Sequence, residues 1–81
     1  MNKLEKSEYV ILSKNNCTNC DIVKELCDDY FIDYTVIKME DLTDNEFNEI
    51  KPKDAKIYPF VFKNKEFIGG FKELRKILLQ T

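Results

Sequence analysis

The sequence predicts an α/β fold, in which a four-stranded mixed sheet is flanked by helices in the order β-α-β-α-β-β-α. Two patterns support this prediction. Short apolar runs rich in β-formers alternate with segments of helical spacing, and the last two strands are close enough to form a hairpin. The chain has 81 residues, 43% of them hydrophobic, which suits one modest core. We therefore expect residues 1–81 to form a single domain.

The first half of the chain predicts a strand, a helix and a second strand. Residues 8–13 are a short apolar run between polar residues, typical of a buried strand. Residues 34–39 are again rich in β-branched residues and predict a second strand. Because a helix is predicted between the two strands, we expect them to be parallel, with a right-handed crossover. The helix is predicted from apolar residues that recur at helical spacing between residues 20 and 31: Ile22, Val23, Leu26, Cys27, Tyr30 and Phe31.

A short second helix is predicted from its start signal. Thr43 and Glu46 fit a capping box, in which each side chain binds a backbone N–H at the helix start. Leu42 and Phe47 fit the hydrophobic staple that accompanies such a box. This helix should end near Ile50.

The remaining residues predict a hairpin and a final helix. Residues 60–64 and 65–68 are the two strands, with Asn64-Lys65 as a plausible turn. Gly69-Gly70 ends the hairpin, and residues 71–78 carry the apolar stripe of the last helix. The aromatic residues expected in or near the core are Tyr9, Tyr30, Phe47, Phe60, Phe62 and Phe67.

Charge and hydropathy narrow the functional classes. The formal net charge is −2, and the 13 Lys and Arg residues are scattered, which argues against nucleic acid as the main partner. The apolar runs are only a few residues long, so no membrane span is expected. The first eight residues lack the apolar core of a signal peptide, so we expect a cytoplasmic protein.

Cys17 and Cys20 stand two residues apart, where the first strand leads into the first helix. Cytosolic thiols are kept reduced, so a close pair is more typical of metal binding or catalysis than of a lasting disulfide. A zinc site usually needs four Cys or His ligands, but the chain has three Cys and no His. The sequence therefore favours a redox pair, and half a zinc site completed by a partner is the alternative.

The positions of the cysteines predict different roles. Residues three apart in the first turn of a helix lie within the 4.4–6.8 Å or so between Cα atoms that a disulfide needs. Cys17 faces the free N–H groups of the helix start, and Lys14 adds a positive charge, so Cys17 should favour the thiolate. Cys20 lies one turn deeper. We predict that Cys17 is the attacking nucleophile, Cys20 the resolving thiol, and Cys27 a small core residue.

At these residues the chain resembles the glutaredoxins, which have the thioredoxin fold. The resemblance covers nearly all 81 residues. It rests on the cysteine pair, on Lys14 before it, on Pro59 before the third strand, and on the segment IGGFKEL from Ile68 to Leu74. It implies a thioredoxin-like fold and a glutathione-dependent thiol-disulfide oxidoreductase that reduces protein disulfides and glutathione mixed disulfides.

The resemblance also implies where glutathione, the co-substrate, binds. In the family the proline is cis, and the backbone before it pairs with the cysteinyl part of glutathione. The double glycine and the helix start after it bind the γ-glutamyl end, and the lysine meets the glycyl carboxylate. No metal is required. The residues implied are Lys14, Thr18, Tyr58, Pro59, Gly70, Phe71, Lys72 and Glu73.

The chain departs from the family pattern in three places. Thr18-Asn19 stands where Pro-Tyr is usual, Ile57-Tyr58 where Thr-Val is usual, and Lys72-Glu73 where Ser-Asp is usual. Backbone contacts survive these changes because they need only chain geometry, whereas side-chain contacts change.

Other interpretations stay open from sequence alone. Lys14 could be an ordinary surface lysine, Pro59 a trans turn proline, and Gly69-Gly70 a simple turn. One functional alternative is a hydrogen donor for ribonucleotide reductase that takes electrons from thioredoxin reductase. Another is a dimer around a [2Fe–2S] cluster held by one cysteine of each chain and two glutathiones. The main prediction is a monomer whose partners are glutathione and disulfide-containing proteins.

Overall fold

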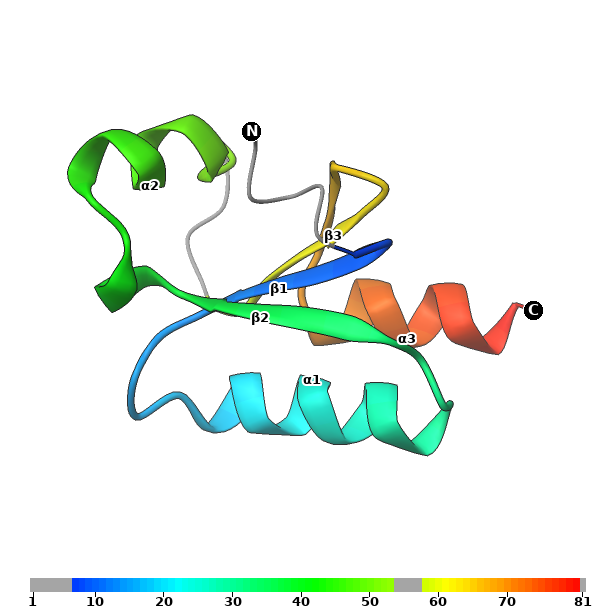
Figure 1. Ribbon diagram of the computed structural model, residues 1–81. Helices are drawn as coiled ribbons and strands as arrows, with labels where there is room; N and C mark the ends of the chain where they lie inside the picture. Colours follow the sequence, from blue (N-terminus) through cyan, green and yellow to red (C-terminus); the bar gives the residue numbers. More distant parts are fainter. Residues whose placement is uncertain (1–6, 54–57, 81) are drawn as a thin grey trace.

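The computed structural model describes residues 7–53 and 58–80. Its elements follow the predicted order β-α-β-α-β-β-α, and one short 3-10 turn, η2, replaces the end of the second predicted strand (Figure 1). Ile57 lies outside the described residues. The bounds of the elements are β1 Tyr9–Ser13, α1 Thr18–Asp29, β2 Tyr34–Lys38, η2 Met39–Asp41, α2 Asp44–Ile50, β3 Phe60–Lys63, β4 Glu66–Gly69 and α3 Phe71–Leu79.

The strand order in the sheet is β2-β1-β3-β4. Strands β1 and β2 are parallel, so their last residues, Ser13 and Lys38, pair at one edge of the sheet. Strand β3 is antiparallel to β1, and its first residue, Phe60, pairs with Leu12 at the same edge. Strand β4 ends there too, because Gly69 pairs with Val61. The segments that follow β1, β2 and β4 and the segment that precedes β3 therefore all lie at this edge, where the strands begin or end.

Helices cover both faces of the sheet, as predicted. Helices α1 and α3 lie on one face and α2 lies on the other (Figure 1). Successive residues of β1 point to opposite faces. Tyr9 and Ile11 belong to the cluster with residues of α1 and α3, whereas Val10 and Leu12 belong to the cluster with Ile50 of α2. Burial on both faces explains why this strand is a continuous apolar run without polar alternation.

The local signals in the second half of the chain are confirmed. The Thr43 N–H donates to Glu46 Oε1 at 2.9 Å, and the Glu46 N–H donates to Thr43 Oγ1 at 3.2 Å, which completes the capping box of α2. Asn64 and Lys65 have φ of 51° and 70°. Two positive φ values between antiparallel strands define the turn that matches the twist of a hairpin.

The prediction that Tyr30 and Phe31 continue the buried stripe of α1 is wrong. Helix α1 ends at Asp29, and Tyr30 and Phe31 are 40% and 94% exposed. Phe31 has a φ of 55°, and the Ile32 N–H donates back to the Cys27 carbonyl at 2.9 Å. This left-handed turn ends the helix before either aromatic ring can reach the core.

Phe67 also differs from the expectation. It is 40% exposed, although its ring centroid lies 6.2 Å from that of Phe60 and 5.8 Å from that of Phe62. The reason is its place on β4, the outer strand beside β3, where one side of the ring has no further strand to cover it.

Candidate active site

Cys17 and Cys20 form a disulfide at the junction of β1 and α1. Their Cα atoms are 5.3 Å apart, so the pair closes within one helical turn. Asn16 has a φ of 57°, and this left-handed residue turns the chain from the end of β1 into the helix. Cys17 itself is extended, with φ −113° and ψ 101°, and is the N-cap of α1.

The two sulfurs have different surroundings. Cys17 is half-buried, and its Sγ accepts a hydrogen bond from the Cys20 N–H at 3.2 Å. Cys20 is 1% exposed and lies on the core face of the helix. A sulfur that caps a helix start gains more from a negative charge than one inside the core, because the N–H groups and the dipole there favour anions. Once the disulfide is reduced, these surroundings favour the thiolate at Cys17.

Cys27, the third cysteine, is fully buried and unpaired. It packs with Val23 and Leu74 between α1 and α3, as expected for a core residue. Burial, and secondarily the charge of Asp28, raises the pKa of its thiol from 9.0 to about 11. Cys27 is therefore protonated in the native protein at neutral pH.

Lys14, Tyr58 and Pro59 lie at the same end of the sheet as the loop that leads to Cys17. The Tyr58–Pro59 bond is cis, and Pro59 is buried. Lys14 Nζ lies 5.2 Å from the centroid of the Tyr58 ring, which stacks on Phe60 with 4.4 Å between centroids. Burial, and then the charge of Glu40, raises the pKa of Tyr58. The ring thus offers its face to a cation while it covers the core.

The double glycine meets the same edge of the sheet. A side chain added at Gly70 would put its Cβ 3.5 Å from the Pro59 carbonyl oxygen, so the two segments approach each other closely. The Gly70 N–H donates to Glu73 Oε1 at 2.7 Å, which caps the start of α3. Phe71 is half-buried against the core, and Lys72 is exposed. Gly69 has a φ of 121°, and a side chain there would collide with Glu73.

Glu40 belongs to this site, although the sequence did not single it out. Its Oε2 accepts a hydrogen bond from the Asn15 N–H at 2.6 Å, which ties the loop before Cys17 to η2. That hydrogen bond, helped by the charges of Lys38 and Lys14, lowers the pKa of Glu40. Only the parallel pairing of β1 and β2, which brings their ends together, could have pointed to this contact.

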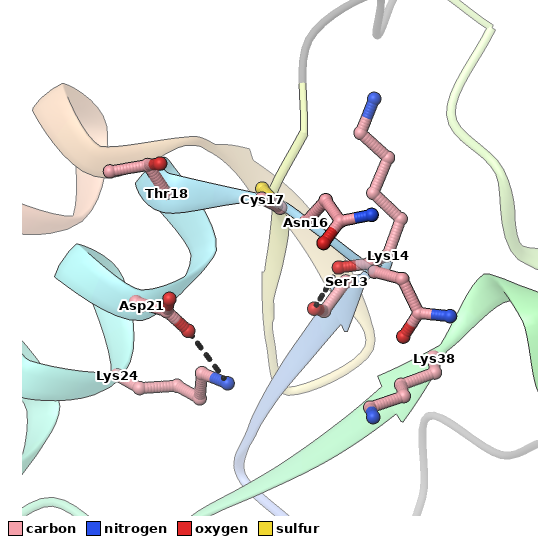
Figure 2. Close-up of a pocket in the computed structure, with 9 residues that line it drawn as sticks. Ser13, Lys14, Asn16, Cys17, Thr18, Asp21, Lys24 and Lys38 are labelled. Atoms are coloured by element: carbon pink, nitrogen blue, oxygen red, sulfur yellow. Dashed lines mark hydrogen bonds and ion pairs between the residues drawn. The ribbon is translucent and has the colours of Figure 1, made fainter.

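A polar cleft of about 450 Å³ opens beside Cys17. We call it the lysine cleft; it is lined by residues 13–18 together with Asp21, Lys24 and Lys38 (Figure 2). Thr18 and Lys14 both belong to its lining. Lys24 Nζ and Asp21 Oδ1 form an ion pair at 3.3 Å on one wall. The sequence did not single out Lys24 or Lys38, but the parallel pairing predicted for the first two strands brings the end of β2, where Lys38 lies, beside the loop after β1.

Two further observations concern the described part of the chain. Within residues 7–53 and 58–80, no group of three or more His, Cys, Asp or Glu side chains is arranged to hold a metal ion. No described helix combines the length and the apolar composition needed to cross a membrane.

A scan against protein-family models finds no match, and a search of curated proteins finds none either. Solved structures do match. The holo form of glutaredoxin C1 from Populus tremula x tremuloides is 22% identical, with a TM-score of 0.73, and the match covers 93% of this chain and 77% of that one. A buckwheat glutaredoxin–glutathione complex is 23% identical, with a TM-score of 0.73, over 91% of this chain and 70% of that one.

A third match is the dithiolic glutaredoxin of Trypanosoma brucei brucei. It is 25% identical, with a TM-score of 0.73, over 91% of this chain and 79% of that one. At these identities the matches establish the fold. The chain has the thioredoxin-like fold of the glutaredoxins, and it carries a Cys17–Cys20 pair in the CxxC arrangement at the start of α1.

Proposed function

We propose that this protein is a glutathione-dependent thiol-disulfide oxidoreductase, in which Cys17 is the nucleophile and Cys20 the resolving thiol. One observation carries the proposal: the disulfide-forming pair is asymmetric, with Cys17 half-buried at the N-cap of α1 and Cys20 buried one turn later. An attacking thiol must be both ionised and reachable, and the N-cap position and partial exposure of Cys17 support this role for it rather than for the buried Cys20.

The proposed cycle needs no group beyond thiols. The Cys17 thiolate attacks a sulfur of a substrate disulfide, a Cys17–substrate disulfide forms, and the other substrate sulfur leaves as a thiolate that takes up a proton. The Cys20 thiolate then attacks Cys17 Sγ, which releases the second substrate thiol and closes the Cys17–Cys20 disulfide. One glutathione opens this disulfide as a Cys17–glutathione mixed disulfide. A second glutathione attacks the sulfur of the first, so that glutathione disulfide leaves, Cys17 is released as a thiolate and both cysteines are reduced.

We infer that glutathione lies along Lys14, Thr18, Tyr58, Pro59 and the start of α3 from Gly70 to Glu73. The contacts Lys14–Tyr58 and Gly70–Pro59 support this inference, because they make one continuous surface from segments far apart in the sequence. A lysine and a helix start are both suited to the carboxylates of the tripeptide. The solved structure of a buckwheat glutaredoxin in complex with glutathione has the same fold.

The test is a glutathione-coupled reduction assay on two substrates, a small mixed disulfide of glutathione and a protein disulfide. Cys17→Ser should abolish both activities. Cys20→Ser should largely keep the first, since glutathione alone completes that cycle, and should lose more of the second, since the first mixed disulfide then waits for an outside thiol. Cys27→Ala is the matched control and should keep both. Activity in Cys17→Ser together with none in Cys20→Ser would reverse the assignment, and an inactive wild type would refute the function.

A further inference from the structure

The lysine cleft brings cationic groups of two different elements into one space that Cys17 also lines. Lys24 comes from α1 and Lys38 from the end of β2, and their side chains extend into the same space from opposite sides (Figure 2). Cys17 is itself part of the lining. A group held at the two lysines therefore shares the cleft with Cys17, the residue proposed to attack the substrate.

The cleft shares only Lys14 and Thr18 with the surface assigned to glutathione. Tyr58, Pro59 and Gly70, which make the centre of that surface, are not part of its lining. Lys14 belongs to both, but its ammonium lies over the Tyr58 ring, and in Figure 2 it extends away from Lys24 and Lys38. A substrate bound at Cys17 thus has a second neighbouring surface, on the side of α1 and β2.

The charge of the cleft differs from the charge of the whole chain. The protein has a net charge of −2, whereas the lining contains three lysines and one acidic residue, Asp21. Asp21 pairs with Lys24, but its side chain is 76% exposed, so a carboxylate from a ligand can compete with it for the ammonium. Glu40 lies outside the lining and is held by the Asn15 N–H. The start of α1 adds further positive potential.

The chemistry of the lining selects the kind of group that fits. Every lining residue other than Cys17 is polar or charged, so the cleft offers hydrogen bonds and ammonium groups rather than an apolar surface. A volume of about 450 Å³ is enough for a short peptide segment with its side chains. We propose that the lysine cleft binds an acidic segment that flanks the target cysteine of a protein substrate, with its carboxylates at Lys24 and Lys38. This inference rests on the proposed function and adds a preference among its substrates.

The test compares three synthetic peptides, each joined by a mixed disulfide to glutathione through its single cysteine. The residues on both sides of that cysteine are Glu in the first peptide, Gln in the second and Lys in the third. The wild-type protein should reduce the Glu peptide with a kcat/KM about 3- to 10-fold higher than the Gln peptide, as expected for one or two partly exposed ion pairs. The Lys peptide should be the poorest. The preference should shrink as salt is raised from low to about 0.5 M.

Variants of the cleft residues test whether the preference for the Glu peptide arises at Lys24 and Lys38. In Lys24→Gln/Lys38→Gln the ratio of kcat/KM between the Glu and Gln peptides should fall to about one, and in Asp21→Asn it should rise. Lys76→Gln is the matched control, because Lys76 is an exposed lysine in the last turn of α3, and its ratio should equal that of the wild type. Equal kcat/KM for all three peptides, or a preference that survives in the double variant, would overturn the inference while leaving the proposed function intact.

Two other results are informative. If inorganic phosphate inhibits reduction of the Gln peptide in the wild type but not in the double variant, and no peptide is preferred, the cleft is a site for a small free anion and the inference is wrong. If the wild type reduces none of the peptides and no small mixed disulfide, the proposed function itself fails.

Discussion

Cys17 and Cys27 lie on the same helix and meet opposite electrostatic conditions. Cys17 caps the start of α1, where its Sγ accepts a hydrogen bond from the Cys20 N–H, whereas Cys27 is enclosed by side chains of the core and lies next to Asp28. The first environment favours a thiolate and the second favours a thiol. One helix can therefore carry a reactive cysteine and an inert one, and the native fold keeps Cys27 out of exchange with the disulfide.

The raised pKa of Cys27 predicts a loss of stability in alkaline solution. The native protein holds this proton up to about pH 11, whereas an unfolded thiol releases it near 9.0. The contribution of Cys27 to the free energy of unfolding is therefore complete below pH 9 and declines as the pH rises from about 9 to about 11. Two pKa units set an upper bound of about 2.7 kcal/mol.

Urea unfolding of the oxidised protein at pH 8 and pH 10.5 measures this loss. Cys27→Ala should be less stable than the wild type at pH 8 because it leaves a cavity, but it should lose less stability between the two pH values. The same alkaline loss in both proteins would contradict the assignment.

The conformation and exposure of Phe31 predict that replacing it with glycine stabilises the protein. It occupies the left-handed position after α1 with a φ of 55°, where a residue with a side chain pays a conformational cost, and its side chain is 94% exposed, so little packing is at stake. We expect Phe31→Gly to raise the free energy of unfolding by about 0.5–1 kcal/mol. The neighbouring Tyr30→Gly is the matched control. Its φ is −97°, so it should lower stability. Denaturant titration distinguishes the two signs, and a loss in both variants would be the contrary outcome.

At the scale of elements, the loop between β1 and α1 depends on a carboxylate from η2. The lowered pKa of Glu40 means that its hydrogen bond to the Asn15 N–H is present above the ordinary pKa of 4.5 and is lost as the pH falls through the lower native value. The backbone amide shift of Asn15 should therefore titrate with a midpoint below that of an ordinary glutamate. Glu40→Gln should abolish this titration and speed hydrogen exchange at Asn15. A midpoint at the ordinary value would show that the loop is not held in this way.

The sequence predicted the elements because most of their signals are local. The apolar run of β1, the capping box at Thr43 and the turn at Asn64-Lys65 each depend on neighbours within a few residues, and the structure contains all three. The end of α1 was misplaced because a left-handed Phe31 is rare enough that periodicity gives no warning of it. Glu40, Lys24 and Lys38 were missed for another reason. Glu40 and Lys38 reach the loop before Cys17 because β1 and β2 end side by side, and Lys24 faces the same cleft from α1, so the arrangement depends on tertiary structure and not on a local pattern.

At the scale of the whole molecule, one edge of the sheet gathers the segments of the proposed site. The chain that follows β1 carries Cys17, the chain before β3 carries Tyr58 and Pro59, and the chain after β4 carries Gly70. An oxidised glutathione added to the Cys20→Ser protein should therefore shift the amide resonances of Lys14, Tyr58 and residues 70–73 together. Shifts confined to surfaces away from this edge would contradict the proposed binding surface. The Cys17→Ser/Cys20→Ser protein, which cannot form a mixed disulfide, separates binding from covalent capture.

The cysteine pair and most of the surface assigned to glutathione come from two different contiguous stretches of the chain. Residues 9–38 form β1, α1 and β2 and hold both redox sulfurs, while residues 58–79 supply Tyr58, Pro59, β3, β4 and α3. The two stretches join in the sheet through the β1–β3 ladder in its centre. The first stretch thus contains both cysteines of the disulfide, and the second contains most of the surface assigned to glutathione. Disulfide exchange that is selective for glutathione therefore requires that β1 and β3 are paired, and its recovery during refolding would measure the association of the two stretches.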